Sequence, residues 1–330
     1  MQPGISTHVF FQHRLHPGLL DALAATGART IEVFAARHHF DYSDALALRE
    51  TASWFRSNDV RAVMHQPIYI TDRADTQWSR HVAPNLDLLA PEKTRRIAAM
   101  DEVKRALEAA EQVPFTAMVL HLGRKDAAWD EPAFEHSLTA IEHLKAFAAP
   151  LGVRLLLENL QNEVATPDNL LSILKTGHFD SVGVCLDIGH LHLVQADALP
   201  ASTSIPGARS STAASSPSMP STDSAAAPAV FGLSAAIALL GSRIAQLHLH
   251  DNHGAFAHTS DMKDEHLWPG SGSIDWPAVM SSLAALPAAT PGILEIAGDR
   301  DEPIESIVSK AQAAFRMIES AQSTHLTHNM

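Results

Sequence analysis

The chain has 330 residues, a formal net charge of −13 and a hydrophobic content of 46%. The hydrophobic content excludes wholesale disorder, and the negative charge disfavours broad contact with nucleic acid or an anionic membrane, because phosphate contacts need a positive face. The single Cys185 excludes an intramolecular disulfide framework, and without a signal-like or membrane-spanning apolar run we expect a soluble, cytoplasmic protein.

Short apolar or β-branched runs alternate along the chain with amphipathic segments. The runs predict eight strands, at residues 5–10, 30–35, 60–65, 116–122, 153–159, 182–187, 244–251 and 292–297. The helices predicted between them include residues 17–26, 91–112, 132–149, 169–176 and 233–240. Nearly continuous apolar strands indicate a parallel sheet covered on both faces. Eight such units predict one α/β domain over residues 1–320, a (β/α)8 TIM barrel, with an open doubly wound sheet as the alternative.

One segment departs from this rhythm. Residues 196–230 consist mainly of Ser, Ala, Pro and Thr, a composition that buries too little apolar surface to offset the entropy lost on ordering. The pattern of strands and helices resumes unchanged afterwards. We therefore expect a low-complexity, disordered insertion between strands 6 and 7, with an interdomain linker as the alternative. Residues 321–330 are expected to form a frayed tail.

Histidine and acidic residues recur at the carboxyl ends of the predicted strands and in the loops that follow. In a closed barrel all these ends open on one face, where the active sites of such barrels lie. Imidazole and carboxylate are ligands that suit Zn²⁺ or Mn²⁺. The positions are His65, His121, Glu158, Asp187, His190, His248, Asp264, His266 and Glu295.

Three of these acids lie inside apolar runs: Glu158 in LLLENL, Asp187 in GVCLDIGH and Glu295 in GILEIAG. An unpaired carboxylate buried in such a run would cost several kcal/mol. Few Lys or Arg residues lie at neighbouring strand ends, so a shared divalent cation is the economical partner. A lone histidine at a strand end is, by contrast, more often a hydrogen-bonded core residue than a ligand.

The segment HLHDNH, residues 248–253, contains three histidines. His248 and His250 lie on the same face of the predicted strand but differ in depth by about 6.6 Å. Spacing alone therefore does not choose between them as ligands. His253 lies beyond the strand, in the loop.

The order of the strand-end motifs MHQP, LHLG, LENL, LDIGH, HLHDN, DEHLWPGSGSIDW and LEI resembles the xylose isomerase-like TIM barrel superfamily over residues 5–315. HLHDN together with DEHLWPGSGSIDW is the most specific part of the resemblance. This superfamily contains sugar and sugar-phosphate isomerases and epimerases. It also contains endonuclease IV-type enzymes, which act on abasic DNA.

On the isomerase and epimerase pattern, the resemblance implies one divalent ion, Mn²⁺ or Zn²⁺ with Mg²⁺ or Co²⁺ as alternatives. Its ligands would be Glu158, Asp187, His248 and Glu295. Glu158 and Glu295 would also be the catalytic acid and base that move a proton through an enediolate, with His190 beside the substrate. In this pattern the first histidine of HLHD is the ligand, which leaves the second as a hydrogen-bonded residue.

On the endonuclease pattern, the resemblance implies a three-zinc cluster. The additional ligands would be His65, His121, His190, Asp264 and His266, and this sequence provides all of them. The cations of the predicted mouth loops are accompanied by Asp and Glu, which disfavours a DNA-binding surface.

A divalent-metal-dependent sugar isomerase or epimerase is therefore the preferred function, and a zinc-dependent phosphodiesterase of the endonuclease IV type is the alternative. The expected partner is a small-molecule sugar or sugar phosphate, with neither nucleic acid nor a membrane. The PGSGS turn, residues 269–273, could donate N–H groups to a substrate phosphate, although such turns are usually only tight turns. Which sugar is used, and whether the chain forms a homo-oligomer, stay open.

Overall fold

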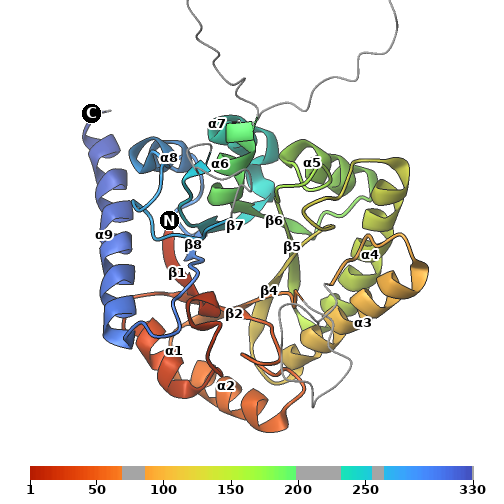
Figure 1. Cartoon of the computed structure of the whole chain (residues 1–330), viewed down its shortest axis with the longest axis horizontal. Helices are drawn as coiled ribbons and strands as arrows, with labels where there is room; N and C mark the ends of the chain where they lie inside the picture. Colours follow the sequence, from red (N-terminus) through yellow and green to blue (C-terminus); the bar gives the residue numbers. More distant parts are fainter. Residues whose placement is uncertain (69–85, 198–231, 255–263, 329–330) are drawn as a thin grey trace, which may run out of the picture.

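The computed structural model of the chain describes residues 1–68, 86–197, 232–254 and 264–328. Within this part, eight parallel strands close into a barrel in the order of the sequence, as Figure 1 shows from one end. This confirms the predicted (β/α)8 fold. The strands are β1 Gln2–Ser6, β2 Thr30–Phe34, β3 Arg61–His65, β4 Phe115–Leu120, β5 Arg154–Glu158, β6 Gly183–Asp187, β7 Ile244–Leu249 and β8 Pro291–Leu294.

The helices surround the barrel as an outer ring (Figure 1). Helix α4 illustrates why they form: Asp130 caps its first turn by accepting from the N–H of Ala133 at 2.8 Å, and Ile141 and Leu144 are fully buried. The helices are α1 Pro17–Ala24, α2 Ala45–Ser57, α3 Lys93–Glu108, α4 Glu131–Ala148, α5 Pro167–Thr176, α6 Ile188–Asp197, α7 Leu233–Leu240, α8 Trp276–Leu283 and α9 Ile304–His328. None of the described helices has the length and apolar character needed to cross a bilayer.

The barrel interior carries a small apolar cluster of its own, separate from the large one beneath the helices. Its members are Val63, Ala117, Val119, Leu156 and Cys185. Side chains alternate along a strand, so the residue two positions beyond an interior residue also points inward. This period directs the strand-end His and acidic side chains of β3, β5 and β6 into the barrel, above an apolar floor.

The predicted position of the first strand, residues 5–10, is wrong. Strand β1 is Gln2–Ser6, because Gln2 to Ile5 pair with β8 and Gly4 to Ser6 pair with β2. The Ser6 hydroxyl then accepts from the N–H of His8 at 3.3 Å and starts a 3-10 turn, Thr7–Phe10. The other seven predicted strands coincide with β2 to β8 to within a few residues at their ends.

The predicted insertion lies between β6 and β7, as expected. Its greater part, residues 198–230, is outside the described part of the chain, so its disorder stays a prediction. The frayed tail at residues 321–330 also stays a prediction, with helix α9 assigned to His328.

Deletion of residues 198–227, which leaves helices α6 and α7 intact, is expected to change the free energy of unfolding by less than about 0.5 kcal/mol. The physical reason is that a Ser, Ala, Pro and Thr segment contributes few apolar side chains to a core. Urea denaturation of the deleted and full-length chains, with metal content measured in parallel, checks this. Aggregation of the deleted chain would contradict the insertion hypothesis.

Candidate active site

All nine strand-end positions predicted from the sequence converge on the carboxyl end of the barrel. They form overlapping groups whose ligand atoms lie within 4.8 Å of one another. We call Glu158, Asp187, His248 and Glu295 the central cluster, because all four are buried and Glu158 is shared with a neighbouring group. Three further groups flank it among the described residues. Two of them are named the His65 cluster and the His190 cluster, and the third consists of His8, His266 and Glu295.

The central cluster is organised around the Nδ1 atom of His248. This atom lies 3.1 Å from a carboxylate oxygen of Glu158, 3.1 Å from one of Glu295 and 3.7 Å from one of Asp187. Glu158 and Asp187 are the last residues of β5 and β6, and Glu295 directly follows β8. Three carboxylates and one imidazole, brought from four strands, form the donor set that a small divalent cation prefers.

The His65 cluster consists of His65, His121 and Glu158. The Nε2 atoms of the two imidazoles lie 3.0 Å apart, and that of His121 lies 2.9 Å from the second carboxylate oxygen of Glu158. Glu158 therefore directs one oxygen to each cluster and can bridge two ions.

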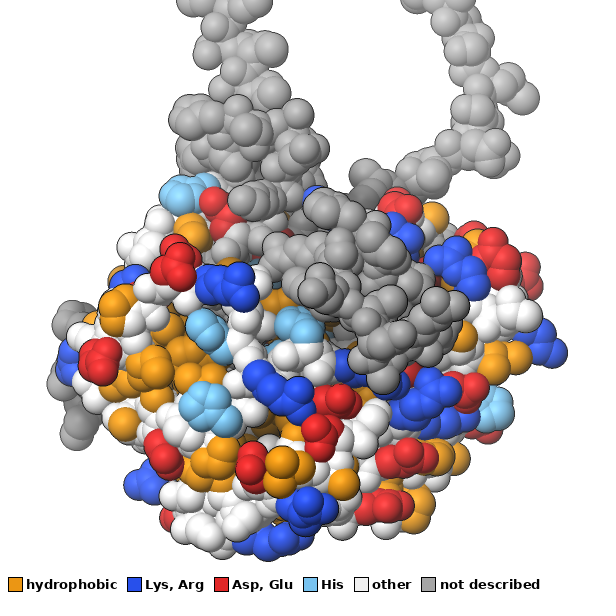
Figure 2. Space-filling model, turned by 60° about the horizontal axis from the view of Figure 1, so that its bottom comes forward, with side chains coloured by type: hydrophobic (Ala, Val, Ile, Leu, Met, Phe, Trp, Pro, Cys, Tyr) orange, Lys and Arg blue, Asp and Glu red, His pale blue; other side chains and the backbone are white. Residues whose placement is uncertain are grey.

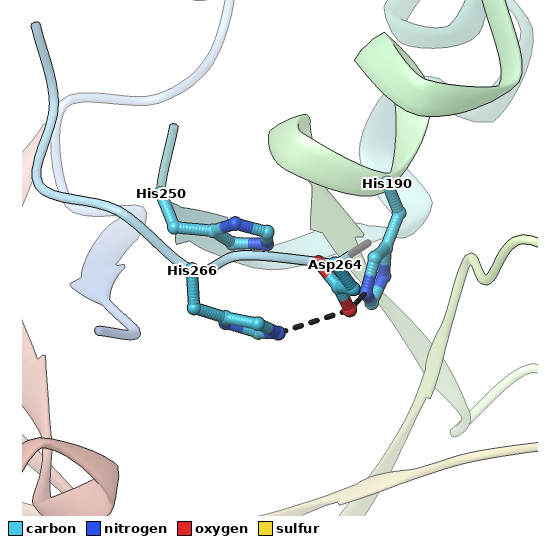
Figure 3. Close-up of side chains that lie close together, drawn as sticks. All are labelled: His190, His250, Asp264 and His266. Carbon is cyan, nitrogen blue, oxygen red and sulfur yellow. Dashed lines mark hydrogen bonds and ion pairs between the residues drawn. The ribbon is translucent and has the colours of Figure 1, made fainter. Parts of the chain in front are cut away.

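The His190 cluster consists of His190, His250, Asp264 and His266. Figure 3 shows one Asp264 oxygen between the imidazoles of His190 and His266, at 2.9 and 3.0 Å from their Nε2 atoms. The ring of His250 is stacked on that of His266 with centroids 3.9 Å apart, and its Nε2 lies 3.0 Å from Asp187. His250 thus contacts both this group and the central cluster.

The backbone determines which nitrogen each imidazole presents. The Nδ1 atoms of His65, His190 and His266 lie 2.8 to 2.9 Å from the carbonyl oxygens of residues 66, 159 and 295. A carbonyl can only accept, so each Nδ1 carries a proton and each Nε2 faces the site. Nε2 of His190 and Nε2 of His266 lie beside an oxygen of Asp264, which also only accepts, so without a metal these two nitrogens carry protons as well. Hydrogen bonds of this kind, made by the ring nitrogen that does not face the metal, orient the histidines of metal sites.

The carboxylates of the clusters favour the binding of protons or cations. Burial alone would lower the pKa of His266, but Asp264 outweighs it and raises the pKa to about 10. Burial likewise opposes the shifts at His190 and His248, where facing carboxylates, and Cys185 beside His248, hold the pKa well above its usual value. Against the effect of burial, His248 holds the pKa of Glu158 and Glu295 well below its ordinary range. With no metal bound, protons on the imidazoles neutralise the acids.

A divalent cation suits this donor set. No Lys or Arg of the described residues forms an ion pair with Glu158, Asp187 or Glu295, so within that part of the chain imidazoles are the cationic groups that face these carboxylates. Asp187 also accepts from the backbone N–H of His190 at 2.7 Å. The second oxygen of Asp264 is buried with no hydrogen-bond partner among the described residues. Buried acids in this number require a counter-charge, and the histidines around them are ligand types as well.

A cavity of about 790 Å³ adjoins the clusters. Glu158, Glu295 and His190 line it, whereas Asp187 and His248 lie beneath and are fully buried. The cavity therefore reaches the two glutamates but not the other two members of the central cluster. Its remaining described lining is His8, Phe34, His65, Gln66, Ile68, Leu86, His121, Gly123, Arg124, Lys125, Asp126, Leu160, Gln161, Asp264 and His266.

Two residues of this region were missed in the sequence analysis. His8 follows β1, lines the cavity and stacks on Phe34 with centroids 4.9 Å apart; burial lowers its pKa to about 3. Glu32 lies in the middle of β2 and is fully buried. A carboxylate inside the apolar run TIEVFA was a detectable signal of the kind that marked Glu158, but Glu32 is not at a strand end.

The N–H groups of the PGSGS turn form hydrogen bonds within the loop that contains it. Asp251 accepts from the N–H groups of Gly270 and Ile274 and from the indole of Trp276, at 2.9 to 3.1 Å. The N–H groups of Ser271 and Ser273 donate to backbone carbonyls. These donors are therefore occupied, and the turn offers no free N–H from these four residues to a substrate phosphate.

The buried acids and histidines gather at the carboxyl end of a parallel barrel, where the active sites of such barrels lie. Residues 20–319 match the family described as Xylose isomerase-like TIM barrel, and the chain belongs to this family.

The chain is similar to an uncharacterized protein of Methanocaldococcus jannaschii, with 23% identity over 75% of this chain and 72% of that protein. Two crystal structures share the fold. One is D-psicose 3-epimerase in the presence of D-fructose, with TM-score 0.66, 15% identity, and coverage of 98% of this chain and 99% of that one. The other is the IOLI protein with a binding zinc atom, with TM-score 0.66, 15% identity, and coverage of 96% and 98%.

Proposed function

We propose that this protein is a divalent-metal-dependent sugar isomerase or epimerase. The observation that carries the proposal is the central cluster, in which three carboxylates and one imidazole converge and only the two glutamates reach the cavity. The D-psicose 3-epimerase and the zinc-containing IOLI protein among the structural neighbours support the reaction class and the use of a metal. Glu158, Asp187, His248 and Glu295 are the residues that would hold the ion, Mn²⁺ or Zn²⁺.

When bound, a divalent ion would polarise the substrate carbonyl and stabilise negative charge on its oxygens. Glu158 and Glu295 are placed to exchange a proton with the carbon next to that carbonyl. One glutamate removes the proton as a carboxylate. The other takes up a proton from solvent or from a substrate hydroxyl, and it returns that proton to the same carbon from the opposite face or to the adjacent carbon. His190 lines the same cavity, with Nδ1 bonded to the carbonyl of Asn159 and Nε2 to Asp264, so it would bond a substrate oxygen by exchanging Asp264 for that oxygen.

The lining of the cavity suits a polyhydroxy compound. Gln66 and Gln161 line it with side-chain amides, a group type that hydrogen-bonds sugar hydroxyls. Phe34 and Leu160 offer apolar surface for the C–H face of a sugar.

The flanking clusters favour a second candidate, a zinc-dependent phosphodiesterase of the endonuclease IV type. With the His65 and His190 clusters beside the central one, three ions could be held, which would suit attack on a phosphodiester. Against DNA as the substrate, the described Lys and Arg side chains on the face drawn in Figure 2 are interspersed with Asp and Glu rather than gathered in one basic patch. At the cavity, Arg124 pairs with Asp126 at 3.8 Å. The sugar reaction is therefore the stronger candidate.

Solvent-deuterium exchange tests the proposal directly. With Mn²⁺ supplied, the protein is expected to catalyse the incorporation of deuterium from solvent at a carbon next to the carbonyl of at least one ketose. The panel of ketoses includes D-fructose and D-tagatose, and mass spectrometry measures the incorporation. Nicking of abasic DNA without any exchange into the ketoses would instead support the phosphodiesterase.

A further inference from the structure

A fourth buried carboxylate lies below the central cluster. Glu32 is in the middle of β2, with its side chain fully buried inside the barrel. Its register partner on β3 is Val63, a member of the apolar interior cluster. The fold therefore places a charged side chain in a layer that is otherwise largely apolar.

The contacts of Glu32 cross the barrel to β7. Its Oε2 accepts from Nε2 of Gln246 at 2.7 Å and lies 3.0 Å from Nε2 of His248. Its Oε1 has no hydrogen-bond partner among the described residues. A buried carboxylate with one unpaired oxygen is a net cost to folding. Its presence is therefore better explained by what it does for His248 than by a contribution to stability.

The two nitrogens of His248 face different groups. Nδ1 lies 3.1 Å from Glu158 and from Glu295, whereas Nε2 lies beside Glu32. Both nitrogens therefore face carboxylates, which only accept, and without a metal each nitrogen carries a proton. Nε2 also lies 3.2 Å from the amide nitrogen of Gln246. An ion bound at Nδ1 would replace the proton there, and the remaining Nε2–H bond to Glu32 would hold the orientation of the ring.

We propose that Glu32 is a positioning residue of the metal site: it holds the Nε2–H tautomer and the ring orientation of His248, so that Nδ1 binds the ion. The inference rests on the proposed function only in requiring that the central cluster binds a divalent ion. Gln246 supports the arrangement because its amide donates to the same Glu32 oxygen that faces His248. Carboxylate–histidine–metal arrangements of this kind tune both the affinity for the ion and the geometry of the ligand.

The test compares two fully buried glutamates, Glu32 and Glu102. In Glu32→Gln, the affinity for Zn²⁺, measured by competition with a chromogenic chelator, is expected to fall about 10- to 100-fold. The visible absorption of the Co²⁺-loaded protein is expected to change, because the orientation of an imidazole ligand changes. Glu102→Gln is the matched control, since Glu102 binds Arg37 and Arg105 away from the site. It is expected to leave both readouts as in the wild type even if it lowers stability.

Unchanged Zn²⁺ affinity together with an unchanged Co²⁺ spectrum in Glu32→Gln would overturn the inference while leaving the proposed function intact. A wild-type protein that binds no divalent ion would overturn both. Should Glu32→Gln fail to fold, Gln246→Leu removes the amide that orients Glu32. That variant is expected to weaken Zn²⁺ binding several-fold, and wild-type affinity in it would count against the inference.

Discussion

Replacing Glu158 with Gln is expected to lower turnover of the ketose substrate by at least about 10³-fold. Glu158 is the one residue shared by the central and His65 clusters, with its two oxygens 3.1 Å from His248 and 2.9 Å from His121. A glutamine amide cannot accept the substrate proton, and it is a weaker ligand than a carboxylate. The rate of deuterium exchange into the ketose, measured with saturating Mn²⁺, gives the effect.

Glu163→Gln is the matched control for this variant. Glu163 is exposed and lies five residues further along the same loop, where it accepts from the N–H of Trp129. Its turnover is expected to remain within a factor of two or so of the wild type, as for most surface substitutions. A Glu158→Gln protein that keeps more than about a tenth of wild-type turnover would show that Glu158 is not the proton-transfer group.

Removing the metal is expected to abolish turnover and to lower stability. The central cluster then keeps three buried carboxylates with protons on imidazoles as their only counter-charge among the described residues. Metal at 100 times its dissociation constant stabilises the fold by about 2.7 kcal/mol, and this contribution is lost on chelation. Calorimetry of chelated and reloaded protein measures the loss as a lower Tm, and adding Mn²⁺ or Zn²⁺ back is expected to restore both Tm and turnover. A metal-free preparation with full activity would refute the proposed mechanism.

The number of ions per chain separates the two candidate functions. Occupancy of the central cluster alone gives about one ion per chain, whereas filling the His65 and His190 clusters as well gives about three. Elemental analysis of protein purified without chelators provides this number. About one ion, together with exchange into a ketose, supports the isomerase or epimerase, and three zinc ions with cleavage of abasic DNA support the phosphodiesterase.

Much of the site was predictable because the acids that form it lie within short apolar runs, which are visible in the local sequence. Glu158, Asp187 and Glu295 stand out as acids inside apolar runs, and the alternation of strands and helices places their strand ends on one face of a barrel. The structure brings these residues together with His248, as expected. The position of β1 was not predictable in the same way, because the apolar run of residues 5–10 also suits the turn that Ser6 starts.

The sequence by itself determined the fold class, the acids that need a counter-charge and the end of the barrel where they meet, because each depends on periodicity and on the cost of burying charge. Only the tertiary structure decided which interior residues touch. Glu32 and His248 are 216 positions apart and lie in contact across the barrel. His250 stacks on His266 because the bridge between Asp251 and Leu267 brings the chain back beside the end of β7. His8 and Phe34, which follow β1 and end β2, are stacked as well. Contacts across the barrel follow from closure of the sheet and from strand stagger, which no local pattern records.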